Sequence, residues 1–149
     1  MFADLIRRLT APATSLDTLD TKRALGALLV RVARTDGHYD PEEKALIDQV
    51  FVEEFGFDAA EASALRSECE TLEAEAPDTV RFTKALKDNV AYEARAGLIK
   101  AMWRIVLADG SRDSGEDALM RMIAPMLGLT DQESHRLRLE VAQSAASQR

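Results

Sequence analysis

Apolar residues recur along this chain at intervals of three and four, the spacing that places side chains on one face of an α-helix. No segment shows the every-second-residue alternation of a β-strand. In the first half, two such stripes predict helices over about 20–35 and 41–55. The stripe residues are Leu25, Leu28, Leu29 and Val32 in the first, and Leu46, Ile47, Val50 and Phe51 in the second. The pattern therefore predicts an all-α protein.

The ends of the helices carry their own local signals. Asp58 followed by Glu61, and Thr130 followed by Glu133, have the spacing of a capping box, which predicts a helix start at each place. A glycine lies between two apolar residues at 55–57 and again at 127–129, where it predicts a helix end with left-handed backbone.

The second half repeats the pattern of the first after a short helix expected over about 78–90. Its stripe residues are Ile99, Met102, Trp103, Ile105 and Val106, followed by Leu119, Met120, Ile123 and Leu127. We expect one domain over 1–149 with about seven to eight helices. It would consist of two repeated three-helix units, over about 20–76 and 93–146, joined by a bridging helix that lets them share a core. At the N-terminus, Phe2, Leu5, Ile6 and Leu9 predict a short helix docked on that core.

A polar motif, Asp-Gly-x-x-Asp-x-x-Glu, occurs twice, each time at the corner between two expected helices. Its acidic residues are Asp36, Asp40 and Glu43 in the first copy, and Asp109, Asp113 and Glu116 in the second. The second aspartate of each copy is an expected N-cap, and the glutamate is its reciprocal partner at the third helical position. The first aspartate has no such local role.

Two carboxylates of each copy are expected to point inward. Asp36 follows Val32 by four residues and so continues the apolar stripe, whereas Glu43 precedes Ile47 by four. Carboxylates that converge in a partly desolvated corner repel each other and need a compensating partner. The partner could be an arginine such as Arg31 or Arg104, the free N–H groups of the next helix, or a hard divalent cation.

The candidate cations are Ca²⁺ and Mg²⁺, because all candidate ligands are oxygens. The motif is not an EF-hand loop, since its glycine is in second place. His38 of the first copy is replaced by Ser111 in the second, so a duplicated histidine ligand is excluded. His135 has no partner motif and is expected at the surface, and no organic cofactor is expected.

Charge and cysteine content narrow the function further. The net charge of −7 argues against general nucleic-acid binding, which leaves a basic footprint. Acidic residues dominate 36–78 and basic residues 79–108, so a dipolar molecule is expected. Cys69 is the single cysteine, which excludes an internal disulfide and favours a cytoplasmic location. We expect an inert thiol there, and no stretch long enough to be a transmembrane segment.

The duplicated motif resembles that of the bacterial tellurite-resistance TerB-like family, and of the similar domain in membrane-anchored DnaJ co-chaperones. The resemblance rests on Leu-Ala-Asp-Gly-Ser-Arg-Asp-Ser-Gly-Glu at 107–116 and covers about 20–142. Two departures are Thr35, where the family favours alanine, and Gly115 within the first turn of the next helix. The resemblance implies an all-α fold of seven or eight helices, with metal-binding clusters at Asp36, Asp40 and Glu43 and at Asp109, Asp113 and Glu116.

For function, the resemblance implies a role in tellurite or chemical-stress response, through protein partners at the cytoplasmic side of the membrane and without enzymatic activity. The residues leave an alternative, a protein-interaction scaffold or homo-oligomer whose corner carboxylates are purely structural. An enzyme is disfavoured, because the chain offers no Gly-rich phosphate loop, no His-rich metal set and no nucleophile–base pairing. We therefore expect a non-catalytic, cation-binding, cytoplasmic bacterial module, peripheral to the inner membrane.

Overall fold

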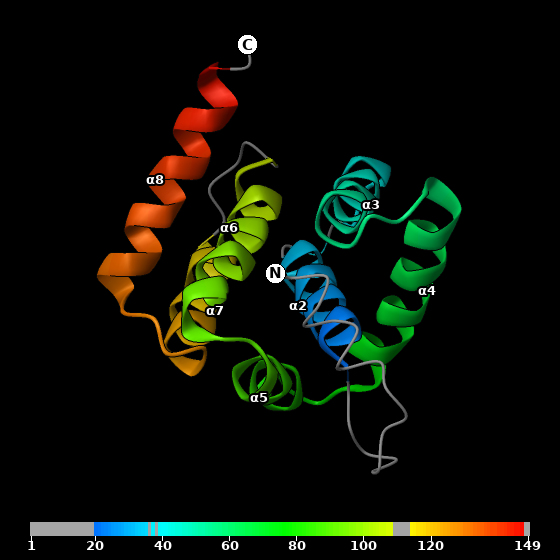
Figure 1. Ribbon diagram of the computed structural model, residues 1–149, viewed down its shortest axis with the longest axis horizontal. Helices are drawn as coiled ribbons and strands as arrows, with labels where there is room; N and C mark the ends of the chain where they lie inside the picture. The colour runs from blue at the N-terminus through cyan, green and yellow to red at the C-terminus, as the bar shows by residue number, and fades with distance from the viewer. Residues whose placement is uncertain (1–19, 36, 38, 109–113, 148–149) are drawn as a thin grey trace.

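The computed structural model describes residues 20–35, 37, 39–108 and 114–147, and the side chains of these except 114–117 and 145–147. This part of the chain forms seven α-helices and no strand, which confirms the all-α prediction (Figure 1). The helices are α2 (Thr21–Arg34), α3 (Pro41–Phe55), α4 (Ala59–Glu75), α5 (Val80–Asn89), α6 (Tyr92–Ala108), α7 (Ser114–Met126) and α8 (Asp131–Ser147). The expected N-terminal helix with Phe2, Leu5, Ile6 and Leu9 lies outside the described residues, and the division into two repeat units stays a prediction.

The helices start and end where their local signals predicted. At the start of α4, the Asp58 N–H donates to Glu61 and the Glu61 N–H donates to Asp58. Thr130 and Glu133 form the same reciprocal pair at the start of α8. Gly56 and Gly128 adopt the left-handed backbone, at φ 69° and 84°, that favours glycine after a helix.

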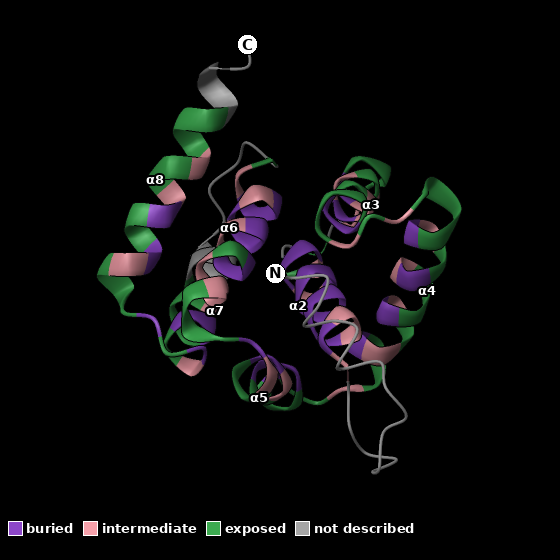
Figure 2. Cartoon of the chain, in the orientation of Figure 1, coloured by how far each residue is buried: buried purple, intermediate pink, exposed green. Residues whose placement is uncertain are grey.

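Helix α2 is the centre of the fold. It packs against α3, α4, α5 and α6, so that α3 and α4 flank it on one side and α6 to α8 extend on the other (Figure 1). The stripe residues Leu25, Leu28, Leu29 and Val32 are fully buried, as predicted. Ala24, Ala27 and Val30 are buried as well, because neighbouring helices surround α2 (Figure 2). A helix predicted to be amphipathic is therefore buried almost all round.

In the second half, α6 packs against α8 and α5, and α7 packs against α5 and α8. Ile99, Met102, Trp103, Ile105 and Val106 of α6 are all buried, and α8 lies along this helix. Between the two halves, α5 contacts α2, α6 and α7 and contributes Phe82 and Leu86 to the same continuous core. Within the described residues, no helix is long and apolar enough to cross a bilayer.

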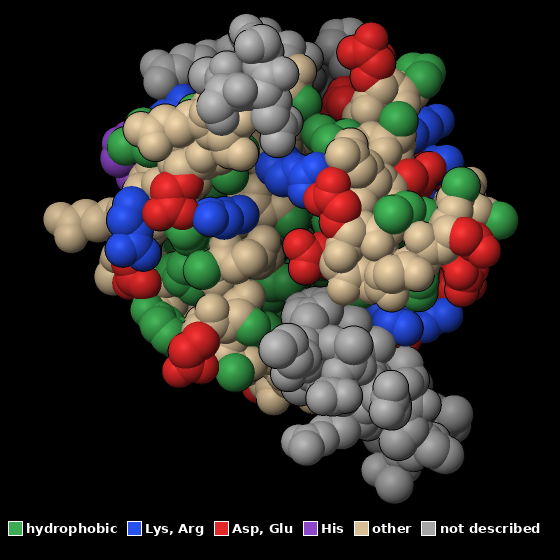
Figure 3. All heavy atoms as spheres, turned by 45° about the horizontal axis from the view of Figure 1, so that its top comes forward, with side chains coloured by type: hydrophobic (Ala, Val, Ile, Leu, Met, Phe, Trp, Pro, Cys, Tyr) green, Lys and Arg blue, Asp and Glu red, His purple; other side chains and the backbone are tan. Residues whose placement is uncertain are grey.

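On one face of the molecule, charge is less segregated than along the sequence (Figure 3). On the face shown in Figure 3, acidic and basic side chains are interspersed. Several arginines pair with acids that are distant in sequence, including Arg23 with Glu68 and Arg104 with Glu53. Folding thus brings bases to the acidic helices α3 and α4.

Candidate functional site

The first copy of the acidic motif lies between α2 and α3. Two of its three acidic residues, Asp40 and Glu43, are described, whereas Asp36 lies outside the described residues. Gly37 has left-handed backbone at φ 82°, so the chain turns sharply after α2. Asp40 is the N-cap of α3, and Pro41 occupies the first helical position, which needs no N–H donor.

Glu43 is the inward-facing carboxylate that the sequence predicted. Its exposed fraction is 6%, although it is in the first turn of α3. The N–H of Asp40 donates to its Oε1 at 3.5 Å, which is the reciprocal half of a capping box. Asp40 itself is exposed. The first corner therefore combines a buried carboxylate with a solvent-facing one.

The second copy of the motif is placed only in part. Asp109 and Asp113 lie outside the described residues, and Glu116 lies in α7 but its side chain is among those not described. Among the side chains that the structure describes, no three acidic, histidine or cysteine groups converge on one point. Metal coordination by Asp36, Asp40, Glu43, Asp109, Asp113 and Glu116 stays a prediction. The oxygen donors of Asp40 and Glu43 fit Ca²⁺ or Mg²⁺ chemically.

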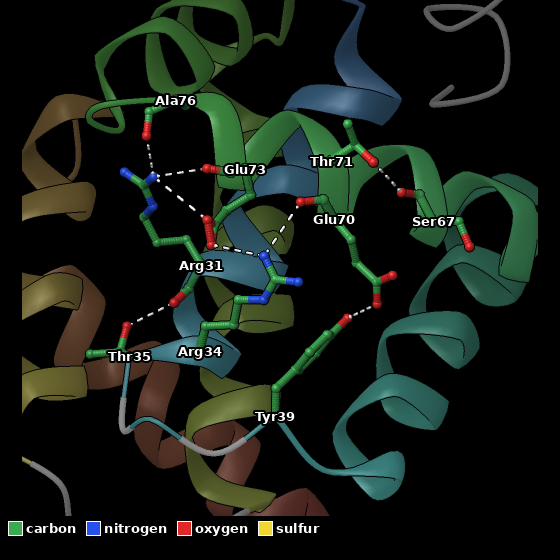
Figure 4. Close-up of polar contacts among 9 residues, drawn as sticks. All are labelled: Arg31, Arg34, Thr35, Tyr39, Ser67, Glu70, Thr71, Glu73 and Ala76. Atoms are coloured by element: carbon green, nitrogen blue, oxygen red, sulfur yellow. Dashed lines mark hydrogen bonds and ion pairs between the residues drawn. The ribbon is translucent and has the colours of Figure 1, made fainter.

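The arginines next to the first corner contact the end of α4. Arg31 donates to the carbonyls of Ala76, at 2.8 Å, and Glu73, at 3.2 Å (Figure 4). Glu73 is buried between Arg31 and Arg34, with oxygen-to-nitrogen distances of 3.6 and 3.4 Å. These arginines thus satisfy the last carbonyls of α4 and place positive charge at the negative end of its dipole. Arg104, the other expected partner, pairs with Glu53 at 2.8 Å.

A second polar cluster joins the corner to α4 through Tyr39. Its hydroxyl donates to Glu70 at 2.6 Å, and Arg66 pairs with both Glu70 and Asp48 (Figure 4 shows Tyr39 and Glu70). Burial opposes the ionisation of Glu70, but the hydrogen bonds from Tyr39 and Arg66 outweigh it and lower its pKa. Burial and the bond to Glu70 raise the pKa of Tyr39. The corner is therefore held to α4 by charge-assisted hydrogen bonds.

The sequence interpretation missed Glu73 and Glu70. Glu73 carried a usable signal, because it follows the buried residues Leu65 and Cys69 by eight and four positions and so continues the stripe of α4. The same rule identified Glu43. Glu70 carried no such signal, since its partner Tyr39 is 31 residues away.

Cys69 and His135 occupy the positions that were expected. Cys69 is free and buried, and burial raises the pKa of its thiol to about 12. The neighbouring acids contribute less than burial does, and Arg23 opposes them. His135 is exposed on α8.

The described residues thus form a helical bundle, in which the acidic corner follows the buried central helix α2. The chain belongs to the TerB family, because the family model of the tellurite resistance protein TerB matches residues 22–139. The match runs from α2 into α8 and includes both copies of the motif. No curated protein and no solved structure matches this chain.

Proposed function

We propose that this protein is a non-catalytic helical module of tellurite and chemical-stress response that binds divalent cations at its two acidic corners. The family match supports the link to tellurite resistance. The cation would be Ca²⁺ or Mg²⁺, because all the donors are carboxylate oxygens. The ligands would be Asp36, Asp40 and Glu43 at one corner, and Asp109, Asp113 and Glu116 at the other.

The observation that carries this proposal is the burial of Glu43. A carboxylate at 6% exposure has lost most of its hydration, and such a group needs charge compensation or several donors. A divalent cation at the corner, shared with Asp40 and Asp36, would supply that compensation. The equivalent acids of the second motif would supply a second site of the same design.

A protein-interaction scaffold is the second candidate function, and it is favoured by the capping box. Glu43 accepts the N–H of Asp40, as a purely structural role requires. In this case the corner would stabilise the fold, and the surface would dock protein partners or a second copy of the chain. Either function fits a cytoplasmic bacterial protein acting peripherally at the inner membrane.

The two candidates are separated by calorimetric titration with Ca²⁺ and with Mg²⁺. The informative variants are Asp36→Asn, Asp109→Asn and Glu43→Gln. Glutamine can still serve in a capping box, so Glu43→Gln removes the charge and keeps the local structure. Glu42→Gln is the matched control, because Glu42 lies in the same turn of α3 and is exposed.

Cation binding predicts saturable heat in the wild type and in Glu42→Gln, and its loss at the altered corner in the other three variants. If none of these three substitutions changes the heat of cation binding, or if no binding heat is seen, the cation proposal is wrong. The scaffold instead predicts that Asp109→Ala lowers the melting temperature equally with and without a chelator. Turnover of a phosphoester with Mg²⁺ or Mn²⁺ that Asp109→Asn abolishes would overturn the non-catalytic assignment.

A further inference from the structure

A cavity of about 220 Å³ is lined by residues of α6, α7 and α8, none of which belongs to the acidic corner described above. Four of its lining residues lie on α8 at intervals of three and four, so they share one face of that helix. The described lining residues are Trp103, Arg121, Asp131, Ser134, His135 and Arg138.

The two arginines of this cavity differ from five of the other arginines that the structure describes. Neither takes part in an ion pair between described residues. By contrast, Arg23, Arg31, Arg34, Arg66 and Arg104 are each paired with a carboxylate. The Arg138 guanidinium lies over the Trp103 ring at 5.5 Å, and its Nε is buried without a hydrogen-bond partner among the described groups. Asp131 is the single carboxylate among the described lining residues, so these residues together carry an excess of positive charge.

Two other lining residues, Ser134 and Trp103, add a neutral hydrogen-bond donor and a flat aromatic surface. The indole N–H of Trp103 donates to the Ser134 hydroxyl at 3.1 Å, which leaves the hydroxyl hydrogen of Ser134 able to bond to a ligand. Trp103 is 6% exposed and presents its flat indole to the cavity. The volume is below the roughly 300–1,000 Å³ that is typical of pockets for drug-sized ligands, which favours a small ligand.

We propose that this cavity binds a phosphate group, either as inorganic phosphate or as the terminal group of a phosphate monoester. Guanidinium groups recognise phosphate through paired N–H donors and keep their charge when partly buried. Arg121 and Arg138 would hold the anionic oxygens, and Ser134 would donate to a third. None of the described residues that line this cavity is among the ligands proposed at the two corners.

Trp103 makes the test direct, because it is the single tryptophan of the chain. Inorganic phosphate is titrated at constant ionic strength into the 149-residue chain, and the fluorescence of Trp103 and its indole N–H resonance are followed. The variants are Arg121→Gln and Arg138→Gln. Arg136→Gln is the matched control, since Arg136 is exposed on α8 and does not line the cavity.

A saturable response in the wild type and in Arg136→Gln, weakened at least tenfold in Arg121→Gln and Arg138→Gln, supports the site. If Arg138→Gln does not fold, Arg121→Gln decides the result, because Arg121 is exposed. A parallel titration with glycerol phosphate shows whether the site prefers a phosphate monoester or inorganic phosphate. Tighter binding of the ester assigns a phosphorylated molecule, and equal or weaker binding assigns free phosphate. No saturable response to either, or an equal loss in Arg136→Gln, would overturn the proposal.

Discussion

The indole N–H of Trp103 donates to the hydroxyl of Ser134 at 3.1 Å, and both residues are buried where α6 packs on α8. Met102 and Leu137, on the same two helices, are buried as well. The bond therefore satisfies a buried donor that no apolar contact could replace. It also sets the orientation of the indole against Arg138.

Removal of this acceptor should destabilise the fold. Ser134→Ala leaves the indole N–H buried and unpaired, which should lower the free energy of unfolding by about 1–3 kcal/mol. Urea denaturation followed by circular dichroism measures the change. Ser67→Ala is the control, because Ser67 is exposed on α4 and should have little effect. Equal losses in the two variants would contradict the role of the bond.

Gly26 of α2 should tolerate no larger side chain. A Cβ at this position would overlap the Sγ of Cys69 and lie 2.9 Å from the Cζ of Phe51. Gly26→Ala should therefore cost about 1–3 kcal/mol of stability through overpacking. Gly97→Ala is the control, because a Cβ there meets nothing within 4 Å and the residue lies inside α6. Gly97→Ala should stabilise the protein by about 0.5–1 kcal/mol, since alanine is the better helix former. Thermal unfolding of the two variants shows whether Gly26→Ala lowers the melting temperature and Gly97→Ala raises it.

Cys69 should be unreactive in the folded protein. Burial raises the pKa of its thiol to about 12, so little of the nucleophilic thiolate exists at pH 8. A thiol-reactive disulfide reagent at pH 8 should label the native protein far more slowly than the urea-unfolded protein. Labelling at the same rate in both states would show that the thiol is accessible.

The same pKa shift predicts a stability change in alkali. The thiol has a higher pKa when folded than when unfolded, so its contribution to stability is complete below about pH 9. The contribution should be lost as the pH rises from about 9 towards about 12. Cys69→Ala should lack this part of the alkaline loss, which unfolding measurements at pH 8 and pH 10.5 would detect. An identical alkaline slope in the two proteins would contradict the prediction.

The bond between Tyr39 and Glu70 should contribute a pH-dependent part of the stability. The pKa of Glu70 is lowered from 4.5, so its contribution is present above that pH and is lost as the pH falls. Tyr39→Phe should reduce the stability at pH 7 by about 1 kcal/mol, with the partial exposure of the pair taken into account. The difference from the wild type should shrink at pH 3.5.

Tyr92→Phe is the matched control for this prediction. The hydroxyl of Tyr92 donates to Glu133 at 2.7 Å, but this pair is exposed to solvent. Its loss should affect the melting temperature much less than the loss of the Tyr39 hydroxyl. A larger effect of Tyr92→Phe would mean that burial does not increase the stability contributed by the bond between Tyr39 and Glu70.

Part of the candidate site could be predicted from the sequence. The inward position of Glu43 followed from its place three and four residues before Leu46 and Ile47, because helical periodicity is a local property. The partners of Arg31 and Arg34 did not follow, since the carbonyls of Glu73 and Ala76 lie 42 and 45 residues from Arg31. The cavity beside Trp103 could not be predicted from the sequence either, because residues of three separate helices line it.

The sequence by itself determined the helices and their ends. Capping pairs such as Asp58 with Glu61, and the left-handed Gly56 and Gly128, act within one helical turn and depend little on the rest of the chain. Only the tertiary structure decided that α2 is buried almost all round, that two arginines contact the end of α4 and that Arg121 and Arg138 line one cavity. Those outcomes depend on which helices become neighbours, and packing sets that through contacts between residues far apart in the chain.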